Sequence, residues 1–189
     1  MIFKRVIDRS QWIGAAKGPW DDEDDLIMDK YMKHLWMVFR HPNLGHLCGY
    51  FVVHTNKLLR KHKCNFFDSQ YWDLNIHGGV TYKEDHFPQA KELLVGKFKL
   101  TKHDLIVGFD CGHCNDFSPC NIMSTQYLFP AEYRTIEYVI KEIKFGIEEM
   151  VLRYQPRFAY PLLREKFTIE EMLSSDNEDL RSLAVYVIR

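Results

Sequence analysis

The chain has 189 residues, of which 46% are hydrophobic and 27% are charged, with a formal net charge of −1 at pH 7. This length fits one globular domain, and the composition excludes an intrinsically disordered chain. The lack of a basic excess argues against general nucleic-acid binding, and no apolar run approaches the roughly 18 residues of a membrane span.

The five cysteines form an odd set, and no apolar leader segment precedes them. Free thiols in a reducing compartment are the economical interpretation of such a set. We therefore expect a cytoplasmic protein.

The N-terminal part of the sequence predicts one helix and two strands. Residues 1–33 are interpreted as a loop followed by a helix near residues 22–34. The apolar runs at 35–39 and 47–53 are typical of buried strands. His41-Pro-Asn-Leu-Gly45 lies between these runs, and its proline and glycine indicate a turn.

The middle of the chain predicts further strands separated by less regular segments. Strands are expected at 74–82 and at 104–110, and a short one at 98–100. A short helix or an irregular connection is expected at 54–62, and a short helical or loop insertion at 87–95. The run at 104–110 has the clearest strand character because it is short, apolar and rich in β-branched residues.

The clearest helix begins after Pro130 and ends before Pro156. Its apolar residues recur at helical spacing and form one stripe that we assign to the core: Ile136, Val139, Ile140, Ile143, Ile147, Met150 and Val151. Capping-box patterns, a hydroxyl residue followed three positions later by Glu, begin at Thr168 and at Ser175. Two short helices are therefore expected in the tail.

Together these elements predict the α+β fold class, with a single domain in which a mixed β-sheet packs against the long amphipathic helix. We expect residues 1–155 to form the α+β core domain. Residues 156–189 are expected to form a short helical tail that packs on this core.

Two segments of the sequence concentrate polar and metal-capable side chains. The strand at 104–110 ends in Asp110, and His113 and Asp116 follow within six residues. The second segment carries His77 directly before two glycines. A strand that ends in such residues places them at one edge of a sheet, on loops of the kind that often carry binding and catalytic sites.

These two imidazoles and two carboxylates form a candidate metal site with His77, Asp110, His113 and Asp116 as ligands. The donor mixture suits a divalent transition metal such as Zn or Mn better than Ca or Mg, which prefer oxygen alone. Asp110, His113 and His77 are also the catalytic candidates, with Asp110 as a ligand or a general base. The alternative is structural: both histidines hydrogen-bond within the fold, and Asp110 caps a turn.

Four further residues are candidates for contacting a ligand. Gly78 and Gly79 allow a phosphate or carbonyl group to approach the backbone closely. Tyr82 offers an aromatic ring. Arg134 lies at the start of the long helix, where unpaired amides favour anions, although helix capping and packing explain it better.

The cysteines leave two other interpretations open. Cys111-Gly-His-Cys114 spells a dithiol motif, but the charge of Asp110 disfavours a thiolate, and the residues that follow are a poor helix start. Cys111, Cys114 and Cys120 together with a histidine are the second option, a structural zinc site. However, the sequence contains only one Cys-x-x-Cys pair, whereas zinc ribbons use two such pairs.

Four motifs occur in a fixed order along the chain: Cys48-Gly-Tyr-Phe-Val52, His77-Gly-Gly-Val-Thr-Tyr82, Gly108-Phe-Asp-Cys-Gly-His-Cys-Asn-Asp116, and Tyr133-Arg-Thr135 leading into the long helix. In their order and approximate spacing, over residues 46–153, the chain resembles a group of small uncharacterised proteins of bacteriophages and prophages. The resemblance implies a viral or prophage setting, in the cytoplasm of an infected bacterial host, and one compact domain. It implies no particular reaction.

We expect a phage accessory protein, with an anti-defence role, whose pocket acts on a small phosphorylated or nucleotide-like ligand by metal-assisted hydrolysis. Two alternatives stay open: a protein that sequesters a nucleotide immune signal without turnover, and a protein–protein inhibitor of a host factor. The expected partner is the small ligand, and neither a membrane nor nucleic acid in general. A homo-oligomer is a further expectation.

Overall fold

The computed structural model describes residues 2–9, 12, 17–54, 74–84, 86–87, 100, 104–120, 131–154, 167–176, 180–181 and 184. Its elements are, in chain order, β1 Ile2–Lys4, the 3-10 turn η2 Pro19–Asp21, β2 Leu26–Tyr31, β3 His34–Arg40, β4 Leu47–His54, β5 Tyr82–Glu84, β6 Asp104–Asp110, α4 Ile136–Tyr154 and α6 Ile169–Ser174.

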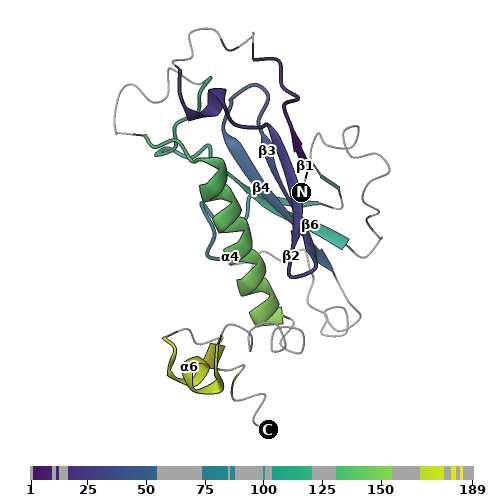
Figure 1. Ribbon diagram of the computed structural model, residues 1–189, viewed down its shortest axis with the longest axis vertical. Helices are drawn as coiled ribbons and strands as arrows, with labels where there is room; N and C mark the ends of the chain where they lie inside the picture. Colours follow the sequence, from purple (N-terminus) through teal and green to yellow (C-terminus); the bar gives the residue numbers. More distant parts are fainter. Residues whose placement is uncertain are drawn as a thin grey trace.

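The six described strands form one sheet in the order β1-β2-β3-β4-β6-β5. Helix α4 lies along one face of this sheet, against β3 and β4 (Figure 1). The expected α+β class and its long helix are therefore confirmed. The sheet that we expected to be mixed is antiparallel in each of its five described pairings.

The prediction of a helix near 22–34 was wrong, because β2 and β3 form a hairpin there. Met32 and Lys33 make its two-residue turn, with φ of +48° and +68°. Left-handed residues at both turn positions match the twist of the flanking strands. The sequence lacks the Asn-Gly or Asp-Gly pair that usually marks such a turn, so its acidic start resembled a helix N-terminus instead.

The strand expected at 74–82 is also wrong over most of its length, since β5 begins only at Tyr82. Gly78 and Gly79 interrupt the extended chain with φ of +63° and +78°. Glycine adopts this left-handed region without the steric cost that other residues carry.

The residues before these glycines are held by helix α4 instead of by a neighbouring strand. The backbone N–H of Asn75 donates to Glu149 Oε2 at 2.8 Å, and that of His77 donates to Glu142 Oε2 at 2.8 Å. Ile76 lies between these two bonds and is buried against the helix. Two hydrogen bonds and the packing of Ile76 therefore hold the segment that carries His77 against α4.

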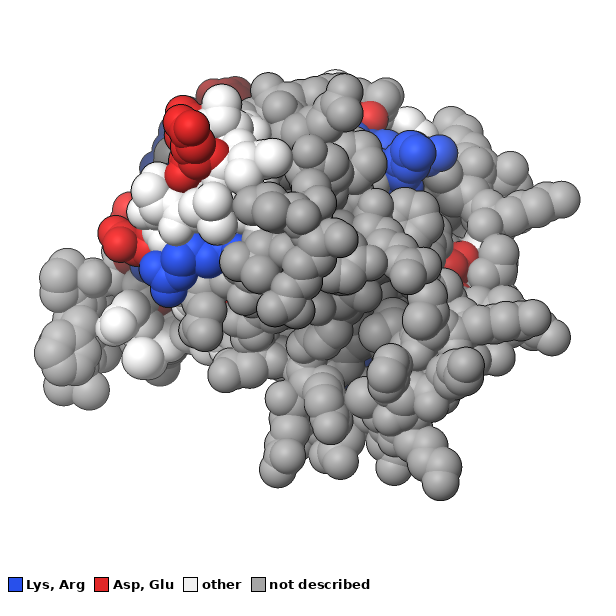
Figure 2. Space-filling model, turned by 90° about the horizontal axis from the view of Figure 1, so that it is seen from below, with Lys and Arg blue, Asp and Glu red and all other residues white. Residues whose placement is uncertain are grey.

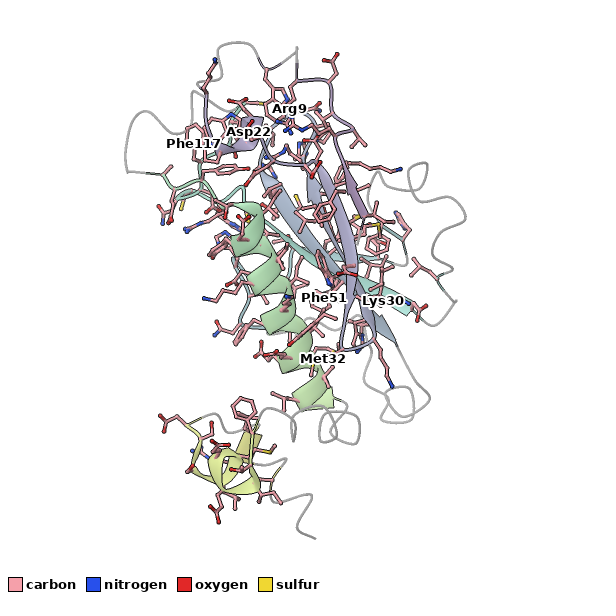
Figure 3. All side chains as sticks on the ribbon, in the orientation of Figure 1. Arg9, Asp22, Lys30, Met32, Phe51 and Phe117 are labelled. Carbon is pink, nitrogen blue, oxygen red and sulfur yellow. The ribbon has the colours of Figure 1, made fainter. Side chains whose placement is uncertain are left out.

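Alternating residues of the central strands supply two hydrophobic clusters, one on each face of the sheet. Phe51 and Phe109 pack toward α4, where they meet Ile143 and Ile147 in one cluster. Phe51 is seen pointing from the sheet toward the helix in Figure 3. The other face holds a second cluster made by Met28, Met37, Tyr50, Val52, Phe87 and Ile106, among others.

The remaining sequence predictions fall into three groups. The turn at 41–45 and the strands at 35–39, 47–53 and 104–110 are confirmed. The capping box at Thr168 is confirmed as well, since its hydroxyl accepts from the N–H of Glu171 at 3.2 Å. Segments 55–62, 88–95 and 98–99 and the capping residue at 178 lie outside the described residues, and the division near residue 155 stays a prediction.

Among the described helices, none is long and apolar enough to cross a membrane. On the face shown in Figure 2, the described residues carry acidic and basic side chains side by side.

Gly146→Ala tests the close approach of the helix to the His77 segment. A methyl group at Gly146 would lie 2.8 Å from Ile76 Cγ2 and 3.2 Å from Phe51 Cε1. Overpacking of about 1–3 kcal/mol outweighs the helix-propensity gain of about 0.5–1 kcal/mol, so we expect a net loss in the free energy of unfolding. Urea denaturation measures it, with the exposed Lys141→Ala as control. A more stable Gly146→Ala protein would show that the two segments are not tightly packed.

Candidate metal centre

Three of the four predicted metal ligands meet at one place in the structure. His77 comes from the segment before β5, and His113 and Asp116 come from the loop after β6. One ligand atom from each residue lies within 4.8 Å of the other two. Such a group of two imidazoles and a carboxylate could hold a metal ion.

Asp116 is the centre of this cluster. Its side chain is 1% exposed, and its Oδ2 lies 2.8 Å from His77 Nε2 and accepts from the backbone N–H of His113 at 3.1 Å. Its Oδ1 accepts from Arg134 Nε at 2.9 Å. Burial alone raises the pKa of Asp116, but the hydrogen bonds from His77 and Arg134 outweigh it and hold the pKa well below its ordinary value. The carboxylate is therefore ionised at neutral pH, as a ligand must be.

His77 bridges the sheet loops and helix α4. While Nε2 faces Asp116, Nδ1 lies 2.9 Å from the hydroxyl oxygen of Tyr138. The ring of His77 stands edge-on to the rings of Tyr138 and His113, with centroids 5.5 and 5.2 Å away. Both nitrogens of this imidazole are thus oriented by neighbours on different elements.

The ring nitrogen Nδ1 of His113 lies close to the carboxylate of Asp116. Its Nδ1 is buried and has no hydrogen-bond partner among the described residues, although it lies 3.4 Å from Asp116 Oδ2. The ring packs over Gly78, where a Cβ atom would fall 2.1 Å from His113 Cε1. Glycine is therefore needed at this position for two reasons: it adopts the left-handed φ without strain, and it has no Cβ atom that would clash with the His113 ring.

Asp110 lies outside the cluster that the other three predicted ligands form. Its Oδ2 accepts from Thr81 Oγ1 at 2.9 Å, and its Oδ1 accepts from the backbone N–H of Gly112 at 3.0 Å. The bond from Thr81 connects the start of the loop to the segment before β5, and the bond from Gly112 closes a turn within the loop. They are the contacts expected of a carboxylate that stabilises a turn.

The candidate ligand-contacting residues fall into two groups. Arg134 reaches the cluster, with its Nη1 also donating to Glu132 Oε2 at 2.6 Å and its guanidinium 4.9 Å above the ring of Tyr138. Gly78 touches the cluster through His113, and Gly79 has open space where a side chain would be.

Tyr82 lies away from the cluster, on the sheet face opposite α4. It packs edge-on against Tyr50 at 5.3 Å and is partly buried against the second hydrophobic cluster, to which Tyr50 belongs. Its hydroxyl donates to the backbone oxygen of His86 at 2.7 Å. The structure therefore gives Tyr82 a packing role on a face that His77 does not share.

Two contributors to the site were missed in the sequence. Tyr138 binds the ring of His77, and Glu142 binds its backbone N–H. Tyr138 and Glu142 lie one turn apart on helix α4, and Arg134 precedes them by the same spacing, two residues before the helix begins. That spacing was visible in the sequence, beside the apolar stripe that we assigned to the core.

A further buried imidazole, His46, lies close to the loop that carries His113. It is 6% exposed, its ring lies 5.0 Å from that of His41, and its Nδ1 is 3.4 Å from Ser118 Oγ. Burial lowers the pKa of His46 to about 4, so the ring is neutral at physiological pH. A Cβ atom on Gly112 would fall 3.0 Å from its Cε1, which places His46 directly behind the His113 loop.

The thiols of the Cys111-Gly-His-Cys114 motif are both free. Burial raises the pKa of Cys111 well above its ordinary value, and nearby carboxylates raise it further. Since the thiolate is the reactive form, this environment disfavours redox chemistry at Cys111.

No family model, curated protein or solved structure matches this chain. The resemblance to bacteriophage proteins therefore stays a prediction.

His46→Gln tests the buried neutral imidazole. The folded state excludes a proton that the unfolded chain accepts at its ordinary pKa of 6.5, so stability is full above that pH and is lost as the pH falls toward 4. We expect wild type to lose about 2 kcal/mol more unfolding free energy between pH 7 and pH 5 than His46→Gln loses. Urea denaturation at both pH values measures this difference. Equal losses in the two proteins would contradict a neutral, buried His46.

Proposed function

We propose that this protein is a metal-dependent hydrolase whose centre is formed by His77, His113 and Asp116. The observation that carries the proposal is the meeting of two imidazoles and an ionised carboxylate within 4.8 Å, where the buried Nδ1 of His113 has no hydrogen-bond partner among the described residues. A buried polar atom without a partner is costly in a native fold, and a bound cation would satisfy it.

The donor set favours Zn or Mn as the ion. Imidazole suits transition metals, whereas Mg and Ca prefer oxygen ligands. Three protein ligands are also the usual number at catalytic zinc sites, which keep a further position open. The chemistry that such an ion supplies is a nucleophile from water at neutral pH and polarisation of a phosphoryl oxygen.

The neighbouring residues favour a small phosphorylated or nucleotide-like substrate. Arg134 keeps a positive charge at the cluster, is 19% exposed, and presents a planar group suited to phosphate oxygens. Gly79, the neighbour of Gly78, has open space where a side chain would be, through which a phosphate could approach the backbone.

The second candidate is a binding protein that sequesters a nucleotide signal without turnover. The observation that favours it is the internal pairing of the cluster, in which Asp116 and both nitrogens of His77 already have partners. In either form, the proposed setting is the cytoplasm of an infected bacterial host, where the protein would counter a defence signal. The two candidates differ in whether the ligand is recovered unchanged.

Metal content tests the centre directly. We expect close to one equivalent of Zn or Mn in the purified wild-type protein and a large loss in His113→Ala and His77→Ala, because each variant removes one of three ligands. Plasma emission spectrometry measures the metal, and His86→Ala is the control for loss of a histidine outside the cluster. If wild type contained no metal even after incubation with Zn²⁺, the result would contradict the hydrolase proposal.

Hydrolysis of a generic phosphodiester tests the reaction class. With bis-p-nitrophenyl phosphate as probe, we expect metal-dependent release of nitrophenolate by wild type. Dialysis against a chelator should abolish it, and added Zn²⁺ or Mn²⁺ should restore it. His113→Ala should lose at least 100-fold in rate, the scale of a removed catalytic group. A metal-loaded protein that turns over neither this probe nor any of a panel of nucleotides, but retains one of them unchanged, would support the binding protein instead.

A further inference from the structure

Tyr138 is the one partner of the His77 imidazole on the side away from Asp116, within the part of the chain that the structure describes. Its hydroxyl oxygen is 2.9 Å from Nδ1, and the two rings meet edge-on at 88°. It comes from helix α4, one turn after Arg134, whose guanidinium lies over its ring at 4.9 Å. Burial and the charge of Glu142 raise the pKa of Tyr138, so its hydroxyl stays protonated at neutral pH.

Without a metal, the direction of these hydrogen bonds follows from the chemistry of the partners. The ionised Asp116 can only accept, so a neutral His77 places its hydrogen on Nε2. Nδ1 then has a free lone pair, and the hydroxyl of Tyr138 donates to it.

With a metal on Nε2, the hydrogen of a neutral imidazole must sit on Nδ1. Nδ1 then donates to the oxygen of Tyr138, so the hydrogen bond persists with its direction reversed. A hydroxyl can serve in both states because it is donor and acceptor at once. An ammonium could serve only in the first state and a carboxylate only in the second.

We propose that Tyr138 is a positioning residue of the metal centre, which holds the His77 ring with Nε2 toward His113 and Asp116 and reverses its hydrogen bond when a metal binds. This inference rests on the proposed metal-binding function. Outer partners of this kind fix the tautomer and orientation of a ligating histidine, and their loss typically weakens metal binding by 10- to 100-fold.

Tyr138→Phe tests the proposal, with Tyr31→Phe as matched control. Tyr31 also donates its hydroxyl to a residue of α4, Glu148, but it lies outside the His77 cluster. The probe is Zn²⁺ alone, and its dissociation constant is measured by competition with a chromophoric chelator. We expect Tyr138→Phe to bind Zn²⁺ about 10- to 100-fold more weakly than wild type, and Tyr31→Phe to bind it as wild type does.

Long-range ¹H–¹⁵N spectra of the imidazoles provide a readout in the wild-type protein that does not depend on the stability of a variant. The His77 hydrogen should sit on Nε2 in the metal-free protein and on Nδ1 after one equivalent of Zn²⁺. Zn²⁺ bound to Nδ1, or equal affinities for wild type and Tyr138→Phe, would overturn the role of Tyr138 while leaving the metal centre intact. A wild-type protein without affinity for Zn²⁺ would overturn both.

Discussion

The buried carboxylate of Asp116 is the interaction on which the site depends. An ionised group removed from water must be paired, and removing its partners costs several kcal/mol. Asp116 meets this demand with His77, Arg134 and the N–H of His113, so it ties the segment before β5, the loop after β6 and the approach to α4 together. The backbone supports the same junction, since Phe117 N–H donates to the oxygen of Glu132 at 2.9 Å. The pairing that satisfies Asp116 thus also brings the two imidazoles to one place.

A second network of ion pairs and hydrogen bonds fixes the start of helix α4. Arg40 is fully buried and pairs with Asp25 and Glu23, while Tyr133 donates to Glu23. Glu23 also accepts from the N–H of Ile136 at 3.1 Å, an unpaired donor of the first helical turn. Because α4 is held here by one network and at Asp116 by the other, its polar side chains keep a defined position against the loop that carries His77.

Local patterns in the sequence were sufficient for much of the fold and for the kinds of residue at the site. The apolar run at 104–110 and the helical stripe before Pro156 are confirmed, because each is strong over its whole length. The hairpin at 26–40 was missed because its turn, Met32-Lys33, carries no glycine or asparagine. Asp110 was grouped with the ligands because it is close to them in sequence, yet the turn after β6 directs its carboxylate to Thr81 and Gly112. Contacts between distant segments, such as Tyr138 with His77, need the assembled fold.

Anomalous diffraction from a crystal of the zinc-loaded protein, recorded on both sides of the zinc absorption edge, tests the central claim most directly. The account predicts one strong anomalous peak at about 2.0–2.2 Å from His77 Nε2, His113 Nδ1 and a carboxylate oxygen of Asp116. A peak at the thiols of Cys111 and Cys114 or at His41 and His46, with none between the three proposed ligands, would contradict it.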